Sequence, residues 1–130
     1  MKYVLMFTSQ PELDRTVSPE RNEELLTEIY RWFETNAAVI ADGGAALQDP
    51  PTAKTVRAGD PSPVVVDGPF SEAKEVIGGF SIIDVPDMDA AVALARTWPE
   101  LTLPGKAVEI RPMFEDEELF ADVAGEQPAP

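Results

Sequence analysis

The chain of 130 residues contains no cysteine and no histidine. Without cysteine it has no disulfide, no thiol nucleophile and no thiolate ligand for a metal. Without histidine it lacks the one side chain that titrates near neutral pH unperturbed, so a general base would have to be a carboxylate, a lysine or a tyrosine with a shifted pKa. We therefore expect no cofactor and no metal, although a carboxylate cage for Mg²⁺ or Ca²⁺ stays open.

Positive charge is also scarce, because 10 Lys and Arg residues face 24 Asp and Glu residues and the formal net charge is −14. Such a field repels a phosphate backbone and an anionic membrane surface, so we expect neither nucleic acid nor membrane as a partner. No apolar run approaches the roughly 20 residues that span a bilayer. Met1 to Phe7 lacks a basic n-region and a cleavage site. We expect a cytoplasmic protein with one core.

The first third of the chain predicts a strand and a long helix. Lys2 to Thr8 alternates two largely apolar sets of side chains, which predicts a strand covered on both faces. Ser18-Pro19-Glu20 is a helix start, with an N-cap, a proline at the first helical position and an acid in the first turn. Asp42-Gly43-Gly44 is expected to stop this helix. Its inner stripe recurs at steps of three and four residues and consists of Leu25, Leu26, Ile29, Phe33, Ala37 and Ile40.

The rest of the chain predicts strands around one further helix. Thr52 to Arg57 and Val64 to Asp67 read as a hairpin joined by turn residues, and Gly79 to Val85 as another strand. Asp87 can cap the second helix, which Pro99 ends. Its inner stripe is Ala91, Leu94, Ala95 and Trp98. Ala107 to Pro112 is expected to form the last strand. Residues 115–130 are acidic and then rich in Pro and Ala, which predicts a tail that is either solvated or bound by a partner.

The predicted order is β-α-β-β-β-α-β, an α+β class close to a ferredoxin-like arrangement. Two helices cover one face of such a sheet and leave the other bare. Yet the first strand, Val64 to Val66 and Phe80 to Val85 carry apolar side chains on both faces. We therefore expect a homodimer in which the bare faces pack together. Burial under loops of the same chain is the alternative.

The most particular stretch is Val64 to Phe80, VVVDGPFSEAKEVIGGF. Pro69 ends the valine strand because it has no N–H for the ladder, and Ser71 with Glu72 reads as the start of a short helical segment. Gly78-Gly79 then marks a bend or a close backbone approach. The motif resembles the signature of the YCII-related domain family, in the subgroup named for its Asp-Gly-Pro-Phe sequence. The resemblance covers residues 1–114.

The resemblance implies a dimeric α+β barrel, in which two ferredoxin-like halves enclose a cleft. The wider family has a proposed enzymatic role built on a histidine and an aspartate, and that pair cannot operate in a chain without histidine. Members of the motif subgroup often occur beside sigma factors of the extracytoplasmic type, which suggests a regulatory or accessory role.

Few side chains stand out as candidates for a site. Asp67 is a weak catalytic candidate, and the favoured interpretation is that it is a turn residue whose side chain bonds nearby backbone N–H groups. Lys74 and Arg111 could hold an anionic or carboxylate group in so negative a molecule, although structural ion pairing of Arg111 with Glu109 or Asp84 is the default. The remaining candidates are Glu72 as a second weak catalytic residue, and Glu75 and Arg57 as ligand-binding residues.

Three functions remain open at this point. The first is a homodimer that binds or senses a small molecule without chemistry of its own. The second is a protein-interaction module linked to sigma-factor regulation, with the acidic tail engaging a basic partner. The third is a cofactor-independent isomerase or cyclase-like enzyme that uses Asp67 or Glu72 as base, with Lys74 or Arg111 stabilising negative charge. We rank them in this order.

Overall fold

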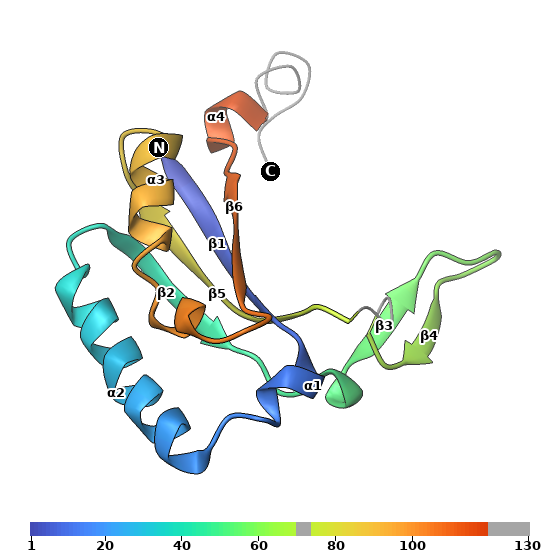
Figure 1. The fold of residues 1–130 in the computed structure, drawn as a ribbon. Helices are drawn as coiled ribbons and strands as arrows, with labels where there is room; N and C mark the ends of the chain where they lie inside the picture. Colours follow the sequence, from blue (N-terminus) through green and yellow to red (C-terminus); the bar gives the residue numbers. More distant parts are fainter. Residues whose placement is uncertain (70–73, 120–130) are drawn as a thin grey trace.

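The computed structural model describes residues 1–69 and 74–119 and shows an α+β fold. Its main sheet has four antiparallel strands in the order β2-β5-β1-β6, and two helices lie against it (Figure 1). The strands are β1 (Lys2–Ser9), β2 (Ile40–Ala46), β5 (Val76–Asp84) and β6 (Ala107–Pro112). The helices are α2 (Pro19–Thr35) and α3 (Met88–Ala95), and the shorter elements are α1 (Pro11–Asp14), η1 (Pro50–Thr52), η2 (Pro99–Thr102) and α4 (Asp116–Leu119).

Both long helices begin where side-chain caps predict. Ser18 Oγ accepts a hydrogen bond from the backbone N–H of Arg21 at 3.1 Å, and Pro19 is the first residue of α2. Asp87 Oδ1 accepts one from the N–H of Ala90 at 2.9 Å at the start of α3. Each cap satisfies a backbone donor that has no partner inside the helix. The two predicted starts are confirmed.

The core lies between the sheet and these two helices. Tyr3 and Leu5 on β1 and Ile83 on β5 are almost completely buried beneath Trp32 of α2. Trp98 meets Trp32 edge to face, with ring centroids 5.0 Å apart. The predicted inner stripe of the second helix is confirmed, because its members are all buried in this cluster or packed against it: Ala91, Leu94, Ala95 and Trp98.

The first helix ends earlier than its apolar stripe predicts. α2 stops at Thr35, and the Asn36 side chain donates to the Trp32 carbonyl at 2.8 Å, so it satisfies a carbonyl at the helix end. The chain then turns, and Ile40 opens β2, where it pairs with Ile83. The prediction that Ala37 and Ile40 continue the helix is wrong. Three- and four-residue spacing cannot distinguish a last helical turn from a turn followed by a β-branched strand residue.

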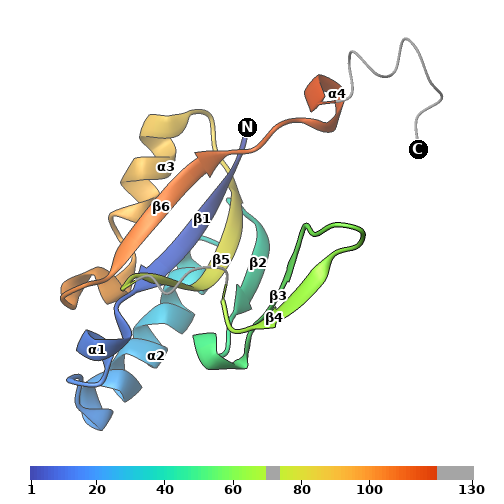
Figure 2. The same cartoon turned by 90° about the vertical axis from the view of Figure 1, so that its right-hand side faces the viewer.

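The predicted hairpin exists but is not part of the main sheet. β3 (Lys54–Arg57) and β4 (Val64–Asp67) pair only with each other, in register Thr55 to Val66. In Figure 2 the hairpin projects from the side of the sheet that faces away from α2 and α3. Its four β4 residues are exposed. The expectation that these valines belong to the central sheet is therefore wrong, because their β propensity fixes a strand but not its partner.

The glycine pair of the motif makes the close approach predicted for it. Register between β1 and β5 shifts opposite Gly78, and a Cβ on Gly79 would lie 2.8 Å from the Ala45 carbonyl oxygen. Gly44 has φ +71° and packs directly against the Phe80 backbone. The short helix predicted from Ser71 and the candidate Glu72 lie outside the described residues, as does most of the predicted tail.

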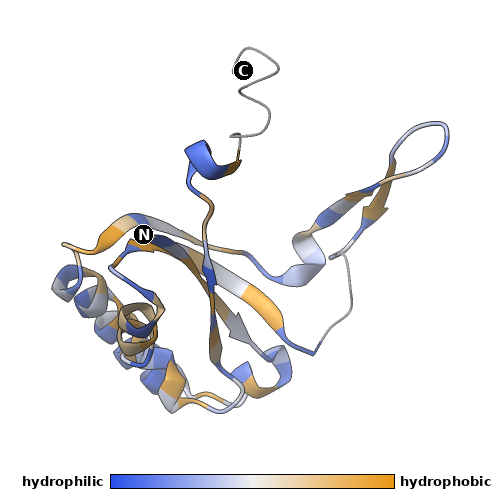
Figure 3. Ribbon diagram, turned by 90° about the horizontal axis from the view of Figure 1, so that it is seen from above, coloured by the Kyte–Doolittle hydropathy of each residue, from blue (hydrophilic) through white to orange (hydrophobic). Residues whose placement is uncertain are grey.

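The second face of the sheet carries apolar side chains, as predicted for β1 and β5. Val4 and Met6 on β1 lie opposite Ile82 and Phe80 on β5, and all four are partly exposed. Figure 3 shows α2 and α3 together on one side of the sheet, with apolar stretches along the strands. We call this second surface the open face. No helix within residues 1–69 and 74–119 is long and apolar enough to cross a membrane.

Candidate functional site

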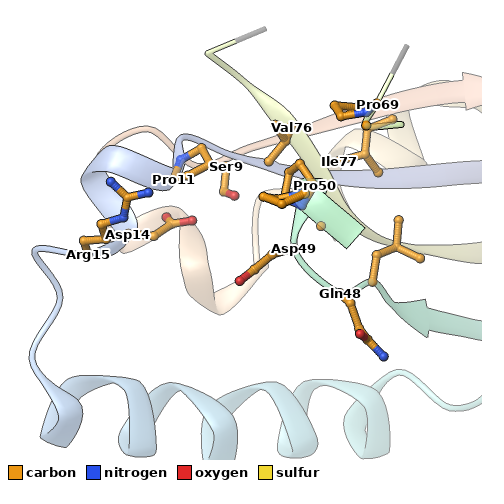
Figure 4. Close-up of a pocket in the computed structure, with 14 residues that line it drawn as sticks. Ser9, Pro11, Asp14, Arg15, Gln48, Asp49, Pro50, Pro69, Val76 and Ile77 are labelled. Carbon is orange, nitrogen blue, oxygen red and sulfur yellow. The ribbon is translucent and has the colours of Figure 1, made fainter. Parts of the chain in front are cut away.

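A cavity of about 700 Å³ lies where the hairpin joins the sheet, and we call it the hinge cavity (Figure 4). Its walls come from the end of β1, α1, the β2–η1 linker and the start of β5. Gly68 and Pro69 border it from one side of the motif, and Val76 to Gly78 from the other. Residues from both sides of residues 70–73, which the structure does not describe, therefore lie at this cavity. Its volume falls within the usual range for small-molecule sites.

Polar side chains in the hinge cavity have unused hydrogen-bonding capacity. Arg15, which follows α1, and Gln48 and Asp49, which precede η1, are among the lining residues labelled in Figure 4. None of these three side chains forms a hydrogen bond or ion pair with another described residue. Ser9 adds a hydroxyl group. A ligand here would meet both free donors and a free carboxylate acceptor.

A second cavity of about 540 Å³ lies between α2 and the glycine-rich part of the sheet, and we call it the helix cavity. Leu26, Ile29 and Phe33 form its helix wall, because their spacing places them on one face of α2. The opposite wall is mostly backbone and consists of Gly43 to Ala46 on β2 and Gly78 and Gly79 on β5. Phe7 and Trp98, stacked with centroids 4.0 Å apart, complete the lining on one side.

A charged cluster borders the helix cavity. Lys106 Nζ lies 3.0 Å from Asp14 Oδ1 and 3.2 Å from Glu100 Oε2, and the lysine side chain is only 13% exposed. Burial by itself lowers the pKa of Lys106, but the two carboxylates outweigh it and the pKa is raised. The ammonium therefore stays protonated at neutral pH. Asp14 Oδ1 is buried and lacks a hydrogen bond of good geometry, although this ion pair meets its charge.

The two cavities adjoin. Ser9, Asp14, Asp49 and Gly78 line both, so together they form one cleft with a polar lobe at the hinge and an apolar lobe under α2. Such a cleft can bind a small molecule that presents hydrogen-bond donors and acceptors at one end and a flat apolar body at the other. Within the described ranges, no group of three or more acidic side chains is placed to hold a metal ion.

The predicted site residues of the hairpin lie at its two ends. Asp67 lies at the base of the hairpin, where its carboxylate forms an ion pair with Lys54 Nζ at 2.6 Å. The Asp67 side chain is 88% exposed and that of Lys54 70% exposed. Arg57 pairs with Val64 at the far end and is also exposed. Neither residue lines the cleft.

The other predicted site residues are also dispersed within one chain. Lys74 and Glu75 are exposed and directly precede β5. Arg111 is exposed on β6 and pairs with Val4, whereas Val76 pairs with Ser9. Five residues of extended strand separate those two positions on β1, about 17 Å. A single chain therefore does not bring Asp67, Lys74 and Arg111 into one cavity, and their roles as site residues stay predictions.

Sequence reasoning missed the polar groups that do line the cleft. Arg15, Gln48 and Asp49 stand in connecting segments, where no periodic pattern singles out a residue. Lys106 follows a Pro-Gly turn and reaches carboxylates from two other parts of the chain. The scarcity of cations, 10 in the whole chain, is the one signal that could have directed attention to Arg15 and Lys106.

The architecture defines the class first: an α+β domain whose antiparallel sheet carries two helices on one face and a cleft at one end. The sequence model of the YCII-related domain family matches residues 1–115, and the chain belongs to this family. The family resemblance read from the sequence is thereby confirmed.

Two individual proteins are similar to the chain. An uncharacterised protein of Rhizobium meliloti (strain 1021) is 27% identical over 114 residues, which cover 87% of this chain and 92% of that protein. The second is the 5-chloro-2-hydroxyhydroquinone dehydrochlorinase of Burkholderia phenoliruptrix AC1100, solved in complex with 2,5-dihydroxybenzoquinone. Its structure matches with a TM-score of 0.50 at 13% identity, over 90% of this chain and 97% of that one. At such identity the likeness concerns the fold alone.

Proposed function

We propose that this protein binds a small molecule in the two-lobed cleft and works as a homodimer. In this proposal it belongs to the Asp-Gly-Pro-Phe subgroup, and two ferredoxin-like halves pack through their open faces into a dimeric α+β barrel. The observation that carries the binding role is the hinge cavity. It is bordered by two parts of the motif, Gly68 with Pro69 and Val76 to Gly78, and lined by polar side chains that have no partner among the described residues: Arg15, Gln48 and Asp49.

The polar groups of the cleft favour a neutral ligand that both donates and accepts hydrogen bonds. Lys106 is already held by two carboxylates, so Arg15 is the cation left to bind a carbonyl or hydroxyl oxygen. Asp49 can accept from a hydroxyl group of the ligand. A net charge of −14 disfavours a strongly anionic ligand. A hydroxylated ring that is neutral at pH 7, such as catechol, fits these demands, and the structural neighbour was solved with a dihydroxylated quinone bound.

Binding is favoured over catalysis because Asp67, the one of the two proposed bases that the structure describes, is poorly placed. Asp67 is 88% exposed and engaged by Lys54, so nothing holds it against a substrate in the cleft. A general base needs a position within hydrogen-bond reach of the proton that it removes.

The open face supports the homodimer. Val4, Met6, Phe80 and Ile82 form an apolar surface that the two helices do not cover. Glu109 and Arg111 flank it on β6, and a two-fold axis would let each residue of one copy meet its opposite in the other. Sheet-to-sheet packing is a common way to bury such a face.

The binding proposal is tested by calorimetry with catechol, a hydroxylated ring that is neutral at pH 7. We expect catechol to bind, and Arg15→Ala to weaken binding about tenfold, because it removes a charged hydrogen-bond donor. Arg31→Ala, which removes an exposed arginine of α2 outside both cavities, is the matched control and should leave affinity unchanged. Absence of binding by the wild-type protein, or equal effects of the two substitutions, would contradict the proposal.

A further inference from the structure

The apolar lobe of the cleft is a cavity that the chain builds but does not fill. Leu26 lines the helix cavity with Ile29 and Phe33, yet it is 69% exposed. Across from it the sheet contributes four glycines, Gly43, Gly44, Gly78 and Gly79, beside residues with side chains: Ala45, Ala46, Phe80 and Ser81. A helix normally packs its apolar face directly on a sheet. Here the glycines of β2 and β5 leave a gap between the two.

Glycine is not required by backbone geometry at every one of these positions. Gly44 has a positive φ, whereas Gly43 does not, and a Cβ on Gly43 would meet no atom within 4 Å. A Cβ on Gly78 would make only an ordinary contact, 3.9 Å from the Phe7 carbonyl oxygen. At these two positions neither strain nor a backbone clash explains glycine. Because both glycines line the helix cavity, the absence of their side chains leaves space in it.

We propose that the helix cavity is the ring-binding lobe of the cleft, so that the ligand is a planar aromatic or quinonoid molecule of more than one ring. Its hydroxyl or carbonyl groups lie in the hinge cavity, and its apolar ring lies between the glycine backbone and Leu26, Ile29 and Phe33. This inference rests on the proposed function and deepens it by giving the size and shape of the ligand. The two cavities adjoin at the residues that line both, so a molecule of this size would extend from one into the other.

The shape of the lobe matches a flat ring in particular. Backbone glycine presents a surface against which an aromatic face can lie, and the stacked pair of Phe7 and Trp98 offers ring contacts on one side. Aromatic rings prefer such offset-stacked or edge-to-face contacts. The cluster of Asp14, Lys106 and Glu100 satisfies its own charges, so it makes no demand for a charged group in this lobe.

The experiment compares catechol with 2,3-dihydroxynaphthalene, which has the same two hydroxyl groups and one additional fused ring. Affinities are measured by calorimetry, and the NMR signal of the Trp98 indole N–H reports whether the helix cavity is occupied. We expect the larger molecule to bind at least about tenfold more tightly, because its second ring leaves water for an apolar lobe. It alone should shift the Trp98 signal.

Two substitutions test the two walls separately. Gly43→Leu fills the lobe from the sheet side and should reduce the affinity for 2,3-dihydroxynaphthalene about tenfold, leaving catechol within about twofold. Leu26→Ala removes part of the helix wall and should weaken only the larger ligand, about threefold. The matched control is Ala41→Leu, which adds the same side chain to β2 at an exposed position outside both cavities.

The outcomes separate this inference from the proposed function. Equal affinity of the two diols, or equal effects of Gly43→Leu and Ala41→Leu, would overturn the ring-binding lobe, while catechol binding that depends on Arg15 would keep the binding role. If neither diol binds to the wild-type protein, the binding role fails, and the ring-binding lobe fails with it. Circular dichroism verifies that every variant is folded.

Discussion

The two faces of the main sheet are built from the same strands but have different environments. On the helix side Tyr3, Leu5 and Ile83 are at most 2% exposed, whereas Val4 and Ile82, next to them in the strands, are partly exposed. Both sets are apolar. Both faces of the sheet thus carry apolar side chains, but the helices of one chain bury only one of them. This difference between the two faces motivates the dimer proposal.

The largest expected effect concerns the helix face. Leu5 is 0% exposed, so Leu5→Ala should lower the free energy of unfolding by about 2 to 5 kcal/mol at any protein concentration. Met6→Ala, the neighbouring position on the open face, should cost less, and its cost should rise with protein concentration because it acts through association. Urea unfolding at two protomer concentrations measures both. Equal and concentration-independent losses would contradict the distinction between the faces.

The second prediction concerns assembly through the open face. Ile82→Glu places a charge at the centre of the proposed contact and should raise the dimer dissociation constant at least about a hundredfold. Because Ile82 is partly exposed, the single chain should still fold. Thr27→Glu adds the same charge on the exposed side of α2 and serves as control. Sedimentation velocity measures the oligomeric state of the wild-type protein and both variants. A wild-type protein that sediments as single chains at micromolar concentration would contradict the dimer proposal.

The third prediction compares two cations, one near each face. Lys106 is 13% exposed and held by two carboxylates, whereas Arg111 is exposed on the open face and has no ion pair with a described residue. Lys106→Met should destabilise the fold by about 1 to 3 kcal/mol, because it leaves partly buried acids without their partner. Arg111→Met should change the stability of the single chain by less than about 0.5 kcal/mol.

The raised pKa of Lys106 gives this third prediction a pH dependence. Above the ordinary lysine pKa of about 10.4 the unfolded chain releases this proton while the folded chain still holds it. The contribution of Lys106 is therefore complete below that pH and decreases as the pH rises through the raised value. The stability difference between wild type and Lys106→Met should shrink with increasing alkalinity in denaturation curves. A difference that is constant across this range would show that packing, not charge, is responsible.

Local signals in the sequence were sufficient for the parts of the fold that one segment decides. The caps at Ser18 and Asp87 and the alternation in β1 depend only on neighbours in the chain, and the structure confirms them. The glycine-containing strand β2 was missed, because its residues Ala41 to Ala46 are all exposed and carry no alternating apolar pattern. Its strand conformation comes from pairing with β5, which is a tertiary contact.

The candidate site was predicted in outline but not in its residues. The motif does border a cavity, yet its described charged residues, Asp67, Lys74 and Glu75, do not line it. Arg15 and Asp49 instead reach the cavity from connecting segments. Charge type and motif membership say which residues are unusual. Whether a side chain turns into a cleft depends on how distant segments meet, and a single sequence records this only through patterns that loops do not have.

The smallest expected effect lies in the hairpin on the open side of the sheet. Lys54→Ala should change the stability of the single chain by less than about 0.5 kcal/mol, although its ion pair with Asp67 is short, because both side chains are mostly solvated. A double-mutant cycle with Asp67→Ala should give the same small coupling in the Ile82→Glu background and in the wild-type protein. A coupling energy that is larger in the wild-type background than in the Ile82→Glu background would mean that the second copy covers the Lys54–Asp67 pair in the dimer. The hairpin would then belong to the interface, and the difference between the two faces would extend beyond the main sheet.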